Sequence, residues 1–240
     1  MPLPIQPYTI QPLTTPYIQE AARCLAETFT GVSNGSYIIA EPIASATNIN
    51  VDQFTGFFED YLKATLDQEF HTIALDNETG RIVGVIGVDI IDPTHEEPPL
   101  EGELADLNHM VAAFEPLNKA LFTKFEHVAG RPLVTGELIH GFVIGVQAPK
   151  DKRYIARSLV EYVVEKAANK GLKGLFVEAT NPRSQRLVKE EFGAYVPTDV
   201  NGTPLTLNYA DDPFFHVIPA DVATTLEILY IPIDETIQLR

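Results

Sequence analysis

The chain has 240 residues, of which 45% are hydrophobic and 21% charged, a balance that excludes a wholly disordered or fibrous protein. With 33 acidic and 17 basic residues its formal net charge is −16, which disfavours binding to nucleic acid or to an anionic membrane. No apolar stretch reaches the ~20 residues that span a bilayer, and the first residues lack the pattern of a signal peptide, so we expect a soluble, cytoplasmic protein.

The first half of the chain predicts two helices, a loop and three strands. Residues that alternate between apolar and polar favour a strand at the start, and Thr15 is a plausible helix N-cap in front of Pro16. A run with turn composition over 76–80 joins two later strands in a hairpin. In chain order the elements are a strand over 8–13, a helix from Thr15 to Gly31, a loop over 33–50, a helix over 51–64, and strands over 71–75 and 81–91.

The second half begins with residues 92–135, which we interpret as an insertion with a helical stretch over 111–125. Its acidic, proline-rich start places His95 beside two glutamates, a composition more typical of a solvated connection than of a metal site. The elements that follow are a strand over 136–146, a loop over 147–153, a helix over 154–170, a strand over 172–179, a helix from Asn181 to Phe192, and strands between Tyr195 and Ile233. Together they predict one mixed α/β domain over 1–240.

The common catalytic motifs of hydrolases, metalloproteases and nucleotide-binding loops are missing from the sequence. Three glycines, Gly80, Gly84 and Gly87, are better interpreted as hairpin and packing residues than as a phosphate loop. The single cysteine, Cys24, occupies an apolar helix position, so we expect a core residue there. It has no second cysteine with which to form a disulfide or a metal site.

The strand–loop–helix unit over 138–170 carries the strongest indication of a binding site. A helix that begins directly after a buried strand presents free N–H groups and a partial positive charge, which together bind phosphate. Lys150, Lys152 and Arg153 form the densest basic cluster of an acidic chain at this point. The cluster fits either a solvated turn or a cradle for a pyrophosphate.

The order of the elements, together with the segment from Val146 to Val160, resembles the GNAT superfamily of acetyl-CoA-dependent N-acetyltransferases. The resemblance covers most of the chain and implies the GNAT acyl-CoA N-acyltransferase fold, in which helices flank a mixed central sheet. In that family the loop amides hold the pyrophosphate of coenzyme A. Here Asp151 stands where the family has Arg or Gln, and Lys152 and Tyr154 stand at the two glycine positions.

This resemblance implies acetyl-CoA as a co-substrate and no metal. The residues that it assigns to coenzyme binding lie on the strand before the loop, in the loop, in the first turn of the helix, and at one later asparagine. They are Ile144, Gly145, Val146, Lys150, Asp151, Lys152, Arg153, Tyr154, Ile155, Ala156 and Asn181. For Asn181 a role as the N-cap of its own helix remains equally open.

Two further segments resemble the arylalkylamine (dopamine-type) N-acetyltransferases within that superfamily. The run Ala40-Glu41-Pro42-Ile43 is similar to their D-E-P-L motif, whose glutamate is regarded as the general base toward the amine. The run from Glu178 to Leu187 is similar to their S-x-x-x-S stretch, and it puts Thr180 and Ser184 at the two serine positions. The resemblance therefore assigns catalytic roles to Glu41, Thr180 and Ser184. An ordinary loop carboxylate would look the same as Glu41.

An alkylammonium has to lose a proton before its nitrogen can attack a thioester, and a carboxylate in a partly dehydrated cleft can accept that proton. The resemblance implies that backbone N–H groups around 144–146 stabilise the oxyanion. Many members of the superfamily have a tyrosine that acts as the general acid, but here Val188 occupies that position. We therefore expect Ser184 to donate the proton to the departing thiolate, with Tyr195 as the weaker choice.

Two other titratable residues on the same strand, Glu137 and His140, have plain structural explanations as well. Glu137 lies near the place where other members put a catalytic glutamate, and it is equally compatible with a surface charge at a strand edge. A single histidine in an apolar strand, such as His140, is usually a hydrogen-bonded core residue.

The main hypothesis is an N-acetyltransferase that moves an acetyl group directly to a primary amine of a small molecule in a ternary complex. The alternative is a catalytically degenerate GNAT-fold module that binds coenzyme A or acyl-CoA as a regulator. We expect the insertion to cover the acceptor side, where its aromatic residues, Phe114 among them, are more typical of packing than of recognition. The oligomeric state stays open, a homodimer included.

Overall fold

A seven-stranded mixed sheet runs through the centre of the computed structural model, with the strand order β1-β4-β5-β6-β7-β9-β8. All neighbouring strands are antiparallel except β6 and β7, which are parallel. The strands are β1 (Tyr8–Pro12), β4 (Thr72–Asp76), β5 (Ile82–Ile90), β6 (Leu138–Val146), β7 (Gly174–Ala179), β8 (Thr206–Asn208) and β9 (Thr225–Pro232), and β2 (Val32–Ser33) pairs with β3 (Ser36–Tyr37) apart from them. The structure describes residues 7–33, 36–37, 41–47, 49–95, 98–147 and 151–240.

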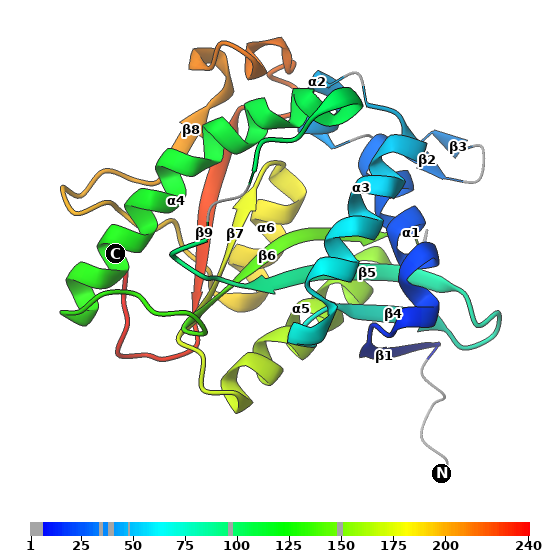
Figure 1. The fold of residues 1–240 in the computed structure, drawn as a ribbon, viewed down its shortest axis with the longest axis horizontal. Helices are drawn as coiled ribbons and strands as arrows, with labels where there is room; N and C mark the ends of the chain where they lie inside the picture. The colour runs from blue at the N-terminus through cyan, green and yellow to red at the C-terminus, as the bar shows by residue number, and fades with distance from the viewer. Residues whose placement is uncertain (1–6, 34–35, 38–40, 48, 96–97, 148–150) are drawn as a thin grey trace.

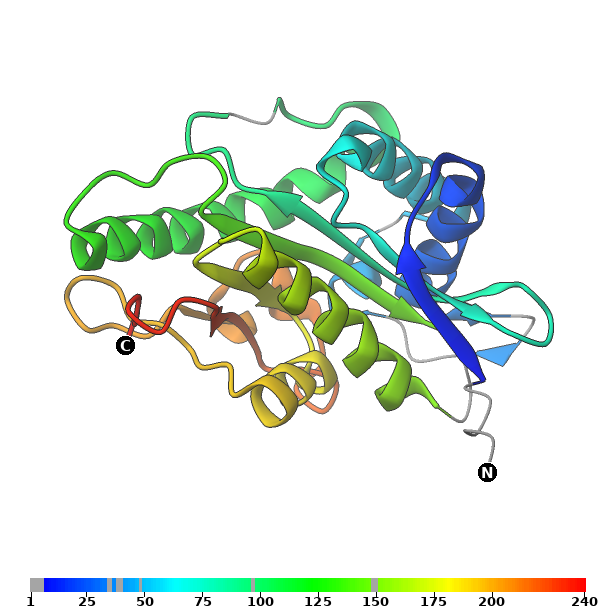
Figure 2. The same ribbon diagram turned by 90° about the horizontal axis from the view of Figure 1, so that it is seen from below.

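Helices cover both faces of this sheet, as the resemblance implied (Figures 1 and 2). Helices α1, α3 and α4 lie on one face, and α5 and α6 lie on the other. The α-helices are α1 (Ile18–Thr30), α2 (Pro42–Ala46), α3 (Val51–Ala64), α4 (Asn108–Ala129), α5 (Lys152–Asn169) and α6 (Pro182–Phe192). Short 3₁₀ turns are η1 (Thr15–Tyr17), η2 (Leu66–Gln68), η3 (Gly102–Leu107), η4 (Tyr209–Asp211) and η5 (Phe215–Val217). None of the described helices is both long and apolar enough to cross a bilayer.

Each face of the sheet has its own apolar core. Because the helices bury only the side that packs on the sheet, their apolar residues repeat at helical spacing, which made the helices predictable from the sequence. Ile155, Leu159 and Val163 repeat on one side of α5 and are fully buried against the sheet. On the opposite face, α1 and α3 contribute a second cluster that includes Phe54 and Phe58. Cys24 belongs to this second core, where burial raises the pKa of its thiol to about 12, so the prediction of a core cysteine is confirmed.

The predicted boundaries need correction in the N-terminal half. The helix expected from Thr15 begins as the 3₁₀ turn η1, whose N-cap is Thr14, and its α-helical part starts only at Ile18. The loop predicted over 33–50 contains the short helix α2, which begins at Pro42 because a proline fits the first helical position.

In the C-terminal half, two predicted helices and one strand differ from the structure. The helix predicted over 111–125 extends over 108–129 and includes Pro116, which is exposed, and the helix predicted from Tyr154 begins at Lys152. Residue Tyr195 forms only an isolated bridge with Tyr230 where a strand was expected. The Tyr195 hydroxyl instead contacts Gln238 and Leu239 near the C-terminus, and no pattern in the sequence predicts these contacts.

One close approach in the sheet predicts a large effect on stability. Gly174, at the start of β7, lies directly under the ring of Tyr230, and a Cβ there would overlap the ring. We expect Gly174→Ala to lower the free energy of unfolding by about 1–3 kcal/mol, the usual cost of overpacking a core. Gly56→Ala is the matched control, because nothing lies within 4 Å of its Cβ position in α3, and it should stabilise by about 0.5–1 kcal/mol. Urea unfolding of both variants measures the two effects, and equal midpoints would contradict the prediction.

Candidate active site

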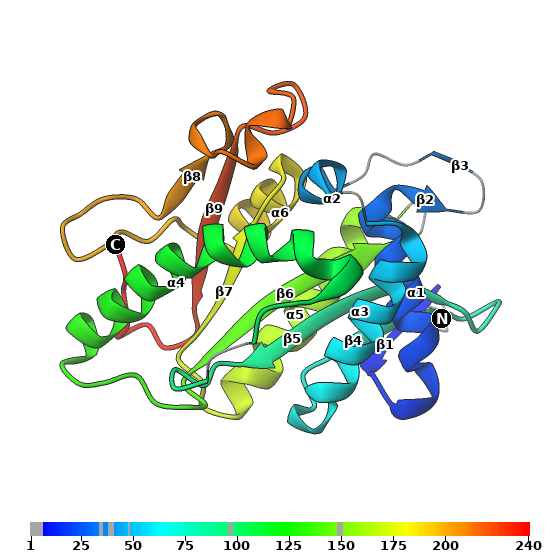
Figure 3. The same ribbon diagram turned by 45° about the horizontal axis from the view of Figure 1, so that its top comes forward.

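A cleft opens where β6 and β7 separate. The two strands pair only over Leu138–His140 and Gly174–Phe176, and beyond these residues they diverge toward their C-terminal ends (Figures 1 and 3). The cleft has an empty volume of about 1080 Å³ with the open solvent at its mouth included. Its walls are mainly apolar and aromatic and come from α1, α3, the η3–α4 segment, α6 and the two strands.

A β-bulge in β6 decides which backbone groups face this cleft. Val88 pairs with Gly141 and Gly87 pairs with Val143, so Phe142 is the extra residue of the bulge. Beyond it the N–H of Gln147 donates to the carbonyl of Val83 on β5 at 2.8 Å. Because polar groups alternate sides along a strand, the N–H groups of residues 144 and 146 point away from β5, to the side from which β7 has diverged.

Glu41 lies at this cleft, between α1 and α2. Its N–H donates to the carbonyl of Phe29 at the end of α1, at 2.8 Å, and its residue forms the N-cap of α2. Its carboxylate accepts a hydrogen bond from the Thr180 hydroxyl on one oxygen and from Asn181 Nδ2, at 2.5 Å, on the other. The two segments that resemble the arylalkylamine N-acetyltransferases, 139 residues apart at Glu41 and Thr180, therefore meet in space.

The environment of Glu41 changes its acidity in a direction that suits a base. Burial raises the pKa of Glu41 above its ordinary value, and the hydrogen bonds from Thr180 and Asn181 oppose this shift. A carboxylate whose pKa is raised toward the working pH accepts a proton more readily than an exposed one.

The turn between β7 and α6 holds the donors to Glu41 in place. Asn181 is the N-cap of α6, and its Oδ1 accepts from the N–H groups of Arg183 at 2.9 Å and Ser184 at 3.0 Å. The capping role is therefore confirmed, while its amide nitrogen contacts Glu41. Behind the turn, the buried hydroxyl of Tyr209 donates to the carbonyl of Thr180 at 2.7 Å.

Ser184 lines the same cleft from the first turn of α6. Its hydroxyl donates to the carbonyl of Asn181 at 3.1 Å. The structure thus brings together all three residues with predicted catalytic roles, Glu41, Thr180 and Ser184, together with Asn181.

The predicted coenzyme loop is described in part, since Lys150 lies outside the described residues. Asp151 precedes α5, and its carboxylate accepts a hydrogen bond from the hydroxyl of Tyr8 at 2.9 Å. Lys152 is half-buried at the first position of the helix, and Tyr154 is 49% exposed. Bulky side chains thus stand where the resembling family has glycines, and that of Tyr154 turns toward solvent.

Arg153, the basic residue predicted to contact a phosphate, is engaged by the protein itself. Its guanidinium contacts the carboxylate of Glu190 at 2.8 Å and that of Glu191 at 2.5 Å, both on α6. These ion pairs fasten the start of α5 to the end of α6 and neutralise the charge of the arginine.

The other predicted coenzyme residues divide between the cleft and the core. Ile144 lines the cleft, whereas Gly145 is packed so closely that a Cβ would contact Leu25 and Thr28 of α1. Val146 and Ile155 are buried in the apolar core between the sheet and α5, and Ala156 is partly buried against the same core. Only backbone groups of these packed residues are therefore available to a ligand.

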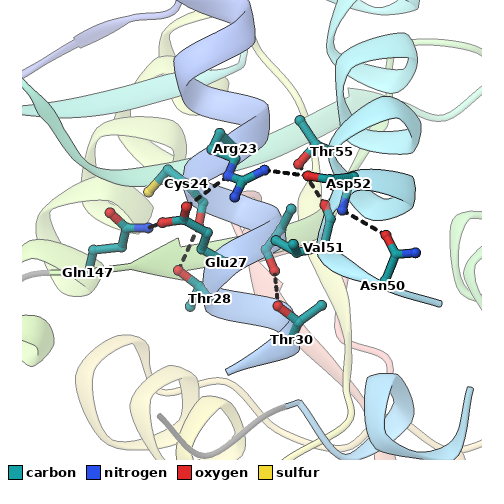
Figure 4. A network of polar contacts seen from close by, with 11 residues as sticks. Arg23, Cys24, Glu27, Thr28, Thr30, Asn50, Val51, Asp52, Thr55 and Gln147 are labelled. Atoms are coloured by element: carbon teal, nitrogen blue, oxygen red, sulfur yellow. Dashed lines mark hydrogen bonds and ion pairs between the residues drawn. The ribbon is translucent and has the colours of Figure 1, made fainter. Parts of the chain in front are cut away.

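A polar network anchors the end of β6 just before the loop (Figure 4). Gln147 Nε2 donates to Glu27 at 2.8 Å, and Arg23 contacts both Glu27 at 2.7 Å and Asp52 at 2.6 Å. The network joins β6 to α1 and to the first turn of α3, so the strand end that supplies the N–H of residue 146 is held from one side.

Comparisons with known proteins find the same fold among solved structures. No protein-family model matches the chain, and no curated protein matches it. Among solved structures, arylalkylamine N-acetyltransferase 2 from Aedes aegypti superposes with a TM-score of 0.73 at 19% identity, over 95% of this chain and 100% of that one. The chain has the GNAT fold. The polyamine N-acetyltransferase of Drosophila melanogaster, which forms N-acetylagmatine, shares this fold at a TM-score of 0.64 and 14% identity, over 94% of this chain and 99% of that one.

A third neighbour with the GNAT fold is the C-terminal condensation domain of Ebony, solved in complex with beta-alanyl-dopamine. It superposes with a TM-score of 0.69 at 14% identity, over 94% of this chain and 98% of that chain. The mixed sheet flanked by helices that the sequence predicted is confirmed by these superpositions.

The alternative titratable residues have structural partners in this GNAT fold. Glu137, buried directly before β6, forms a bidentate ion pair with Arg131, so of its two interpretations the surface charge at a strand edge was wrong. The hydroxyl of Tyr195 accepts from the N–H of Leu239 at 2.8 Å, and Tyr195 does not line the cleft. In the described part of the chain, no group of three or more His, Cys, Asp or Glu side chains is placed to hold a metal ion.

His140 is a hydrogen-bonded residue of the sheet interior, as expected for a single histidine in an apolar strand. It lies between two carboxylates, with Nδ1 3.4 Å from Asp89 and Nε2 in contact with Glu178. Burial favours the neutral imidazole, but Glu178 and Asp89 raise the pKa of His140 to about 10. The imidazole is therefore protonated at neutral pH.

Sequence reasoning missed Glu178 as a residue of the cleft, although it stands inside the quoted segment. A usable signal was present, because Glu178 stands two positions before Thr180, which had been assigned to the site, and side chains two positions apart share one side of an extended chain. The aromatic wall from α3, which includes Phe57, was also predicted only as an apolar helix face.

Proposed function

We propose that this protein is an acetyl-CoA-dependent N-acetyltransferase that acetylates a primary amine of a small molecule. The observation that carries the proposal is the position of Glu41, a partly buried carboxylate at the opening between β6 and β7, held by Thr180 and Asn181. The amine N-acetyltransferases with which the chain shares its fold support the same reaction class.

The described residues fit the pantetheine part of acetyl-CoA better than its nucleotide part. Amide N–H groups of a pantetheine arm can pair with a strand edge, and beyond its pairing with β7 the strand β6 offers the outward carbonyl groups of residues 144 and 146 as acceptors. When bound, acetyl-CoA would supply the acetyl thioester. At the phosphate end, Arg153 is neutralised by Glu190 and Glu191, which leaves backbone N–H groups of the first turn of α5 as donors.

The residues of the chain then divide the proton transfers among themselves. Glu41 takes a proton from the incoming ammonium, directly or through water, and so frees the nitrogen lone pair. The N–H groups of residues 144 and 146 donate to the carbonyl oxygen on which negative charge develops. The hydroxyl of Ser184 passes a proton to the leaving sulfur as the C–S bond breaks, and it recovers a proton, through water, from the nitrogen of the tetrahedral intermediate, which has to lose its second proton to become an amide. No covalent attachment to the protein is needed, so both substrates are bound at once.

The experiment that tests this function measures release of free thiol from acetyl-CoA with a panel of primary amines. We expect thiol release that depends on the amine and a higher melting temperature in the presence of acetyl-CoA. The competing function, a coenzyme A-binding module without catalysis, is favoured by Val188, which lines the cleft at the position of the family's general-acid tyrosine and has no proton to donate. That module would show the thermal shift without amine-dependent thiol release.

Two conservative variants separate the roles of the hydroxyls in the cleft. Thr180→Val removes a hydrogen bond that lowers the pKa of Glu41, so this pKa rises further. Because the base must be ionised, we expect the acidic limb of the kcat profile to move to higher pH. Ser184→Ala removes a hydroxyl that contacts Asn181 and not Glu41, so it should lower kcat and leave the acidic limb where it is. The pH profiles of both variants are the measurement, and an unmoved limb in Thr180→Val would count against the assignment.

A further inference from the structure

The cleft contains a second buried carboxylate, Glu178, which the proposed reaction does not use. Its side chain is only 4% exposed and lines the same cleft as Glu41. Glu178 is the last residue but one of β7, and Thr180 directly follows the strand, so the two residues are two positions apart in the chain, and both line the cleft. Since Thr180 contacts Glu41, the two carboxylates face one acceptor space from two places.

Glu178 is fixed by two partners that leave it free capacity to accept further hydrogen bonds. One oxygen contacts His140 Nε2, and the other accepts from Asn118 Nδ2 at 2.7 Å. A carboxylate has about four lone-pair positions, so each oxygen can accept a further hydrogen bond. The cation of His140 lies between the anions of Asp89 and Glu178, which leaves this buried group with one net negative charge.

This charge is maintained at neutral pH. Burial opposes ionisation of Glu178, but the neighbouring His140 and the hydrogen bonds from His140 and Asn118 lower the pKa of Glu178 below its ordinary value. The two acids of the cleft thus differ in kind, since the pKa of Glu41 is raised and that of Glu178 is lowered.

A second acceptor atom next to Glu178 lacks a donor. The amide oxygen of Asn118 is buried and receives no hydrogen bond from any described residue. Asn118 follows Met110 and Phe114, which line the cleft, at helical spacing on α4, so it belongs to the same helix face. Buried polar atoms are normally paired, and an orphan beside a ligand cleft indicates a donor that arrives from outside the chain.

We propose that the acceptor amine carries a second hydrogen-bond donor, an N–H or O–H group, at the end remote from the reacting nitrogen, and that Glu178 and Asn118 bind this group. The inference rests on the proposed function and adds the substrate class. Because the group around Glu178 has a net negative charge, a positively charged donor binds better than a hydroxyl. The apolar walls between the two carboxylates contact the carbon chain that connects the two ends.

The test compares three acceptors with the same five-carbon chain: pentylamine, 5-aminopentan-1-ol and 1,5-diaminopentane. With acetyl-CoA as donor, we expect kcat/KM to rise in this order, with roughly 10–100-fold between the first and the last. Glu178→Gln should reduce this ratio to a few-fold, because the amide carries no negative charge with which to bind the second donor. Asn118→Ala should reduce the ratio in part, and it serves as the second variant if Glu178→Gln melts at a much lower temperature.

Glu115→Gln is the matched control, because this carboxylate is on the same helix as Asn118 but is exposed and outside the cleft. Equal kcat/KM for the three amines, or a full preference retained by both cleft variants, would overturn the inference. Calorimetry measures the binding affinities of pentylamine and 1,5-diaminopentane without any need for turnover, so it tests the Glu178–Asn118 site separately from the proposed function. Stronger binding of the diamine without any turnover would refute catalysis and support the Glu178–Asn118 site, whereas equal binding would refute the site.

Discussion

Replacement of Glu41 by Gln is expected to lower kcat for amine acetylation about 100- to 10,000-fold, the usual contribution of a positioned general base. Gln keeps the size of the side chain and retains an oxygen that can accept from Thr180, so the architecture of the cleft is preserved. The amide, however, cannot take a proton from the ammonium. Steady-state thiol release at saturating acetyl-CoA measures the loss.

The pH dependence of this variant follows from the direction of the Glu41 shift. Burial raises the pKa of Glu41, so the unchanged protein loses its base as the pH falls through that raised value. Glu41→Gln has no such group, and the rate ratio between the two proteins should therefore be largest at neutral and alkaline pH and narrow in acid. Glu101→Gln, an exposed carboxylate outside the cleft, is the control. A ratio that is constant across pH would remove Glu41 from proton transfer.

His140→Gln should lower the free energy of unfolding by about 3–5 kcal/mol, because the loss of one partner leaves buried charges uncompensated. In this variant Asp89 and Glu178 face each other across the site without the imidazolium between them. Chemical unfolding monitored by circular dichroism measures the effect. His216→Gln, at an exposed histidine, is the matched control and should be nearly neutral.

The stability of the unchanged protein should depend on pH through the same group. The folded-state pKa of His140 is raised from 6.5 to about 10, so its contribution is complete below pH 6.5 and is lost as the pH rises toward 10. The pKa values of Asp89 and Glu178 are lowered, so their contributions exist above their ordinary values and disappear as the pH falls through the lowered ones. A decline between pH 7 and 10 that persists in His140→Gln would contradict this origin.

The local patterns that predicted the fold are those with strong periodicity. Helix α3 was predicted with its observed bounds because its apolar face repeats regularly. The structure adds a capping box at Asn50, just before the helix, which the prediction did not use. The short helix α2 was missed because five residues are too few to show a period. The 3₁₀ turns and the chain from Tyr195 to β8 depend on contacts between distant residues, which alternation within one segment does not reveal.

The candidate site was predictable in part, for a related reason. The segments around Glu41 and Thr180 were assigned to one site from resemblance, and the structure shows them in contact. The pairing of Arg153 with Glu190 and Glu191 was not predictable, since it depends on how α5 and α6 pack against each other. The spacing of Glu178 from Thr180 could have placed it at the site, but its ion pair with His140 on the neighbouring strand was not predictable, since it depends on how β6 and β7 pair.

The bulge at Phe142 changes which residues of β6 direct their backbone groups toward β5 and which direct them toward the β7 side. Before the bulge, the carbonyl of Glu137 accepts from the N–H of Lys173, which lies next to β7, and the carbonyl of Leu138 accepts from the N–H of Ile91, which lies next to β5. In this part of the strand the odd-numbered residues therefore direct their backbone groups to the β7 side. Past Phe142 the even positions take over that side. If the same residues ran through this point in a regular ladder without the bulge, the N–H groups of residues 144 and 146 would turn toward β5, so the bulge is what leaves these two donors on the side of the cleft.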